Sequence, residues 1–148
     1  MRAAPLLFLL LAATTPVSPR PGRWLVESAP GTASLDGRPL TDLPYQAPAA
    51  PRAICLTADA ARDPVAWLAG DTGKGCTFEQ RTMAGGRIDL RGTCPPPAEG
   101  APAGTIRLTG RWTPTSYRVR FVTTNPSENG VMGFSGTLSG RRVGDCAS

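Results

Sequence analysis

The sequence predicts a mainly β protein: a single antiparallel meander sheet of about five to six strands, one short helix packed on its apolar face, and two disulfides. Apolar and polar residues alternate with a period of two from Cys76 onward, which is typical of half-buried strands. Four well-separated cysteines, Cys55, Cys76, Cys94 and Cys146, occur in a chain that has no histidine. These observations favour a disulfide-bonded exported domain over a histidine-dependent enzyme.

Residues 1–20 have the pattern of a removable signal peptide. A basic start is followed by an apolar run over residues 3–13, which is shorter than the about 20 residues that a membrane-spanning helix needs. Cleavage is expected between residues 13 and 20, and no cysteine follows the run where a lipid anchor would be attached. Residues 21–148 then form one domain with one core. The sequence therefore predicts a periplasmic or secreted protein without a transmembrane segment in the mature chain.

The first part of this domain is expected to contain one strand and one loop. Residues 22–28 include Trp24, Leu25 and Val26, which favour a short strand. Residues 29–52 contain five prolines with scattered glycine and alanine. Because proline cannot donate to a sheet ladder, this composition predicts a proline-rich loop.

A helix is expected over residues 58–69. Thr57 is a suitable N-cap, Asp59 places a negative charge in the first turn, and Gly70 ends the pattern. Pro64 lies inside this stretch and removes one backbone donor. The helix is therefore expected either as one rod or as two short pieces that meet near Asp63.

Residues 76–83 and 87–94 are expected to form a hairpin around a turn at residues 84–86. Centring the turn on Gly85 places Cys76 opposite Cys94. The same register predicts two opposite-charge pairs on the outer face, Glu79 with Arg91 and Arg81 with Asp89.

A second hairpin is expected from residues 104–112 and 117–123, followed by a last strand over residues 131–142 after a turn that contains Asn129-Gly130. In this register Trp112 lies opposite Tyr117. The apolar positions of these strands are expected to point inward and are Ile106, Leu108, Trp112, Tyr117, Val119, Phe121, Met132, Phe134 and Leu138.

Four cysteines allow three pairings. An alternating meander brings Cys76 and Cys94 to one edge of the sheet and Cys146 to the opposite edge, near the start of the helix at Cys55. This topology favours Cys76 with Cys94 and Cys55 with Cys146. A helix that doubles back would instead allow Cys55 with Cys76. A zinc site is the competing interpretation, but structural zinc sites usually contain closely spaced cysteine pairs, and export favours oxidation.

No catalytic, cofactor-binding or metal-binding residues are expected, and the protein is not expected to be an enzyme. Without histidine, no serine or cysteine nucleophile has its usual base. The glycines at 133, 136 and 140 favour close packing or bulges over a phosphate loop. Asp59 and Asp63 favour charge compensation at helix ends over a carboxylate pair or a calcium site.

The basic charge is carried almost entirely by arginine, since Lys74 is the only lysine among 16 basic residues. A coding bias explains this composition better than nucleic-acid binding, which is a poor expectation for an exported protein. One cluster is different: the second hairpin places four arginines on its outer side, with two of them directly opposed. The possible anion or partner surface consists of Arg107, Arg111, Arg118 and Arg120. The alternative is an ordinary solvated face.

Several short motifs resemble the small exported Gram-negative bacterial proteins grouped as domain of unknown function family 3617. They include Pro21-Gly22-Arg23-Trp24, Cys55-Leu56-Thr57 at the start of the helix, Gly75-Cys76 and Cys94 around a hairpin, and the terminal Gly144-Asp145-Cys146. The resemblance implies a periplasmic or secreted location and no established activity. Residues 29–52 are the part that matches least.

These expectations favour a non-enzymatic binding or structural module of the cell envelope, with an envelope component or protein as its partner. The first alternative is a small carrier in which Trp112, Tyr117, Phe121 and Phe134 line an apolar cavity. The second alternative is an inhibitor of an envelope hydrolase. Thermal stabilisation by apolar small molecules would distinguish a carrier from a partner-binding module.

Overall fold

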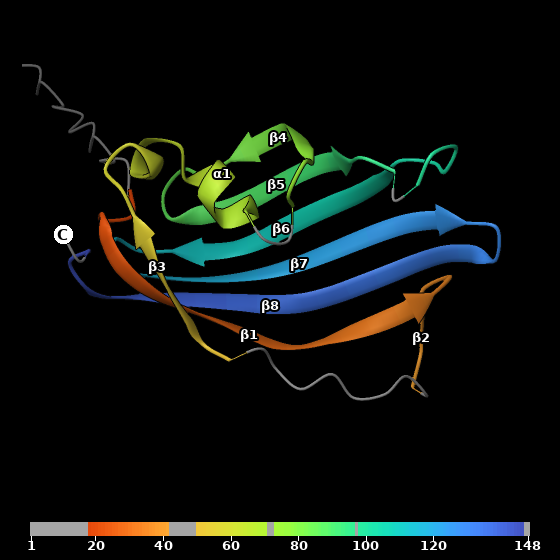
Figure 1. Ribbon diagram of the computed structural model, residues 1–148, viewed down its shortest axis with the longest axis horizontal. Coiled ribbons are helices and arrows are strands. Elements are labelled where there is room, and N and C mark those ends of the chain that lie inside the picture. Colours follow the sequence, from red (N-terminus) through yellow and green to blue (C-terminus); the bar gives the residue numbers. More distant parts are fainter. Residues whose placement is uncertain (1–17, 42–49, 71–72, 97, 147–148) are drawn as a thin grey trace, which may run out of the picture.

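The computed structural model describes residues 18–41, 50–70, 73–96 and 98–146, and it shows one open antiparallel sheet with a short helix over one face (Figure 1). The order across the sheet is β2-β1-β8-β7-β6-β5-β4, and β3 pairs with β1 away from this path. The strands are β1 (Gly22–Leu35), β2 (Arg38–Pro39), β3 (Arg52–Leu56), β4 (Thr77–Thr82), β5 (Arg87–Cys94), β6 (Gly104–Trp112), β7 (Ser116–Ser127) and β8 (Gly130–Gly144). The expected meander is confirmed for β4 to β8.

The sheet has eight strands instead of five to six, mainly because the proline-rich segment is not one loop. The loop predicted over residues 29–52 is wrong at both ends: β1 continues to Leu35 and β3 begins at Arg52. Pro30 is tolerated because the β1–β8 register shifts between Ala29 and Thr32, where the ladder needs no donor from it. Asp36 and Gly37 both have positive φ and form the tight turn between β1 and β2. Residues 42–49 lie outside the described part.

Pro19 and Arg20, at the end of the predicted signal segment, contact the folded domain. Pro19 is buried, and the Arg20 amide donates to the Pro114 carbonyl at 2.8 Å. The Arg20 carbonyl in turn accepts a hydrogen bond from Trp24 Nε1 at 3.1 Å. The predicted signal segment otherwise falls on residues 1–17, which are outside the described residues.

The helical segment takes the two-piece form: the 3₁₀ helix η1 (Ala60–Arg62) and the α-helix α1 (Pro64–Ala69). Thr57 Oγ1 accepts a hydrogen bond from the Ala60 amide at 3.2 Å. Asp63 is the N-cap of α1 and accepts from the Val65 amide at 3.3 Å. Pro64 divides the segment because it fits the first turn of a helix but not a helix interior.

The β4–β5 register follows the expected pairing only at the disulfide end. Phe78 lies opposite Gly92, but the register then shifts, so Gln80 faces Arg91 and Arg81 faces Leu90. The predicted pairs Glu79 with Arg91 and Arg81 with Asp89 are therefore wrong. The physical reason is a bulge that accommodates Glu79 in an edge strand, a place where bulges also discourage pairing with other chains.

In β6 and β7 the register is as expected, with Trp112 opposite Tyr117. In β8, Leu138 packs against the core, whereas Met132 and Phe134 are 37% and 42% exposed. Both side chains lie on the core side of the sheet, as predicted. They are nevertheless exposed, because no other described element covers this end of the sheet. The 15 residues of β8 span about 50 Å, whereas the six residues of α1 span about 9 Å. The far end of the β7–β8 hairpin therefore extends beyond the helix (Figure 1).

Three aromatic rings connect α1 to the sheet. The Trp67 ring lies 5.2 Å from both Trp24 and Tyr117, measured between centroids, in edge-to-face arrangements. Gly140 leaves room for the Tyr117 ring, because a Cβ at position 140 would collide with that ring. Burial raises the pKa of the Tyr117 phenol to about 12, and the positive charge of Arg52 partly opposes the shift. The phenol is therefore neutral at physiological pH.

Two disulfides join the chain at the ends of the strands. Cys76 is bonded to Cys94, with Cα atoms 4.0 Å apart, and Cys55 is bonded to Cys146, with Cα atoms 5.6 Å apart. This is the pairing that the meander topology favoured. All four sulfur atoms are used, so the zinc interpretation and the Cys55–Cys76 alternative are both excluded by this arrangement.

Candidate anion-binding surface

Strands β5 to β8 turn one set of side chains toward the core and the alternate set toward solvent on the opposite face. Seven exposed arginines belong to the second set, and we refer to them as the outer arginine face. Its members are Arg87 and Arg91 on β5, Arg107 and Arg111 on β6, Arg118 and Arg120 on β7, and Arg141 on β8.

The strand register places several of these arginines directly opposite one another. Arg111 lies opposite Arg87 on one side and opposite Arg118 on the other, so three neighbouring strands present arginine at the same level. Arg91 and Arg107 form a second opposed pair. Directly opposed residues have Cβ atoms about 4.5–5.5 Å apart, and like charges in such pairs are destabilising.

Little negative charge compensates this face. Arg107 forms an ion pair with Asp89, at 3.4 Å between Nη2 and Oδ2. The other six arginines have no ion pair with a carboxylate of the described residues. Asp89 is the only acidic residue on this side of β5 to β8, and Glu27 of the neighbouring strand β1 lies on the same side, opposite Ser139, so seven positive charges stand against two negative charges.

The structure thus brings together all four arginines predicted from the sequence, Arg107, Arg111, Arg118 and Arg120. The prediction missed Arg87 and Arg141 and assigned Arg91 to an ion pair with Glu79 that the bulge prevents. A signal was present, because Arg87 and Arg91 alternate with Ile88 and Leu90. Arg87 and Arg141 lie outside the hairpin formed by β6 and β7, and they join its arginines only through the pairs β5–β6 and β7–β8.

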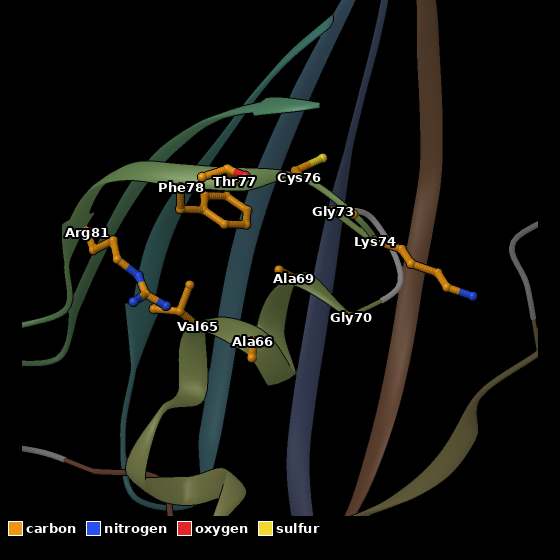
Figure 2. Close-up of a pocket in the computed structure, with 11 residues that line it drawn as sticks. Val65, Ala66, Ala69, Gly70, Gly73, Lys74, Cys76, Thr77, Phe78 and Arg81 are labelled. Atoms are coloured by element: carbon orange, nitrogen blue, oxygen red, sulfur yellow. The ribbon is translucent and has the colours of Figure 1, made fainter. Parts of the chain in front are cut away.

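One cavity lies on the other side of the sheet, between α1 and β4 (Figure 2). Its volume is about 470 Å³, and Val65, Ala69 and Phe78 supply much of its apolar wall. Arg81 borders it and is held by Asp63, with Nη2 within 3.3 Å of both carboxylate oxygens. Figure 2 shows Lys74 directed away from the other lining residues. No member of the outer arginine face contributes to this cavity.

The cavity expected for an apolar-ligand carrier is not formed by the residues predicted for it. Trp112, Tyr117 and Phe121 are buried in the packed core, while Phe134 is partly exposed and its ring lies 5.7 Å from that of Phe121. None of the four lines either of the two described cavities, of which the second, about 330 Å³, lies beside the Cys55–Cys146 disulfide.

The two aspartates considered as a carboxylate pair form local ion pairs instead. Asp59 pairs with Arg62 at 3.3 Å, and Asp63 caps α1 while it pairs with Arg81 at 3.2 Å. Within the described residues, no three histidine, cysteine, aspartate or glutamate side chains form a group suited to a metal ion. The arrangement of Asp59 and Asp63 therefore stabilises the helical segment and its contact with β4.

The fold and the surface together define a small, mainly β protein with two disulfides and a strongly basic sheet face. The family model described as "Protein of unknown function (DUF3617)" matches residues 19–146, and the chain belongs to this family. No curated protein and no solved structure matches the chain. Among the described residues, none of the helices has the length and apolar character required to cross a membrane.

Proposed function

We propose that the protein is an exported, non-enzymatic binding module of the cell envelope whose outer arginine face binds an anionic partner. The observation that carries the proposal is the row formed by Arg87, Arg111 and Arg118 on three neighbouring strands. Opposed guanidinium groups repel one another, and a bound anion would relieve this repulsion. Guanidinium groups also bind phosphate and carboxylate through two parallel hydrogen bonds.

The two disulfides support the export part of the proposal. Disulfides persist in oxidising compartments and are rare in the reducing cytosol. Here the Cys55–Cys146 bridge joins β3 to the segment after β8, and the Cys76–Cys94 bridge joins the start of β4 to the end of β5. A non-enzymatic role is supported by the absence of histidine from the chain and by the local ion pairs that engage Asp59 and Asp63.

Export is tested by producing the full chain with its own N-terminal segment in a Gram-negative host and separating the periplasmic and cytosolic fractions. We expect the protein in the periplasmic fraction, with both bridges present in a non-reducing peptide map. A matched chain that lacks residues 2–17 should stay in the cytosol with reduced cysteines. Recovery of the complete chain in the cytosol with free thiols would contradict the location.

Anion binding is tested with inorganic polyphosphate as the probe and the oxidised protein. The double variant R111Q/R118Q should bind roughly tenfold more weakly, since each exposed guanidinium–phosphate contact contributes up to about 1 kcal/mol. The control R38Q/R62Q removes the same charge from exposed positions outside the outer arginine face and should bind like the unmodified protein. Equal weakening by both double variants would mean that net charge, and not this surface, determines binding.

A further inference from the structure

The outer arginine face spreads in two directions. Its arginines lie on four neighbouring strands, β5 to β8, and three of these strands carry two arginines each. Neighbouring strands are about 4.8 Å apart, and alternate residues of one strand are about 7 Å apart. A single extended polyanionic chain would follow one row or one strand of this array. A two-dimensional array of anionic groups can meet more than one of these rows at the same time.

The side chains around the arginines are polar. None of the seven arginines lines either of the two described cavities. Hydroxyl side chains stand between the arginines and can donate hydrogen bonds to phosphate oxygens. They are Thr93, Thr105, Thr109, Thr124, Thr137 and Ser139. Val122 is the only large apolar side chain among the arginines, and it is partly buried, whereas the exposed Val131 of β8 lies on the same side but six residues before Thr137 and outside the area of the arginines. The face therefore has the chemistry to rest on charged head groups but not to insert into hydrocarbon.

From this geometry we infer that the outer arginine face docks on a membrane surface rich in anionic phospholipid. The inference rests on the proposed function and names its partner. The arginines and hydroxyls meet the phosphate groups of the bilayer, and the opposite face, with α1 and the cavity beside β4, points away from the membrane. Binding is electrostatic, so salt at concentrations well above 0.1 M should reverse it, because the Debye length is then below about 10 Å.

The test is co-sedimentation of the oxidised protein with vesicles of phosphatidylglycerol and phosphatidylcholine, compared with vesicles of phosphatidylcholine alone. We expect binding only to the anionic vesicles, and release when NaCl is raised from 50 to 500 mM. One arginine near an anionic bilayer contributes about fivefold to affinity, so R111Q/R118Q should bind roughly twentyfold to thirtyfold more weakly. R38Q/R62Q should bind like the unmodified protein, and thermal unfolding of each variant verifies its fold.

Three further outcomes would overturn this inference, and the first two also separate it from the proposed function. Binding to polyphosphate or to polyglutamate without binding to anionic vesicles would overturn the membrane inference and leave an anion-binding module, with an acidic protein as its partner if polyglutamate binds more tightly. Failure to bind vesicles and both polymers would overturn both proposals. Unchanged vesicle binding by R111Q/R118Q would overturn the inference, because the arginine row would then have no part in the contact.

Discussion

Replacing both Cys55 and Cys146 by serine should lower the free energy of unfolding by about 4–5 kcal/mol. The bridge joins residues 91 positions apart, and closing so long a loop removes much conformational entropy from the unfolded chain. It also connects the end of β3 to the segment that follows β8. Since domains of this size are stable by about 5–15 kcal/mol, the variant should be close to unfolding at 37 °C.

Urea unfolding of the two paired serine variants provides the measurement and its control. The Cys76–Cys94 bridge closes a loop with a sequence separation of only 18, so C76S/C94S should lose about 3 kcal/mol. The expected result is a lower urea midpoint for C55S/C146S than for C76S/C94S. Equal stability of C55S/C146S and the unmodified protein would show that this bridge does not stabilise the fold.

Replacing Trp24 by alanine should destabilise the protein by about 3–5 kcal/mol, which is typical of a large aromatic side chain removed from a core. Trp24 is fully buried and contacts Trp67 of α1 and Tyr117 of β7. Its Nε1 also donates to the Arg20 carbonyl. The substitution would therefore loosen α1 and the first described residues together.

The effect is measured by chemical denaturation, with loss of the near-ultraviolet circular dichroism signal as a second readout. Phe134→Ala is the matched control: Phe134 is 42% exposed and has one ring partner, Phe121, so the loss should be about 1 kcal/mol. Trp24→Phe keeps an aromatic ring but removes the indole N–H and part of the buried ring, and it should be intermediate. A small effect of Trp24→Ala would mean that the aromatic cluster does not connect the helix to the sheet.

Much of the fold could be predicted because its signals are local. The alternation of Ile88, Leu90, Ile106 and Leu108 with polar residues predicts strands whatever their neighbours are. Pro64 predicts that the helical segment divides into two pieces, because proline has no backbone N–H to donate inside a helix. The extension of β1 was also readable, since Asp36-Gly37 is a strong turn signal. The prolines around this turn do not oppose it, since Pro30 lies at a register shift and Pro39 lies in the two-residue edge strand β2.

The candidate surface could be predicted only in part. The opposed Arg111 and Arg118 follow from one short hairpin whose loop sets the register. Arg87 and Arg141 join them only through strand pairs on either side. Asp89 was expected to neutralise Arg81 and instead pairs with Arg107, because a single bulged residue in β4 changes the partners.

The sequence by itself determined the five meander strands β4 to β8, where the short helix divides, and, except in the bulged β4, which side chains of each of these strands share a face. Those properties depend on neighbouring residues and on the two-residue repeat of a pleated strand. Only the tertiary structure decided that β1 pairs with β8, that α1 leaves Phe134 uncovered, and that seven arginines meet on one face. Such contacts join distant residues, and a shift of one position in the register changes the partner of every side chain that follows.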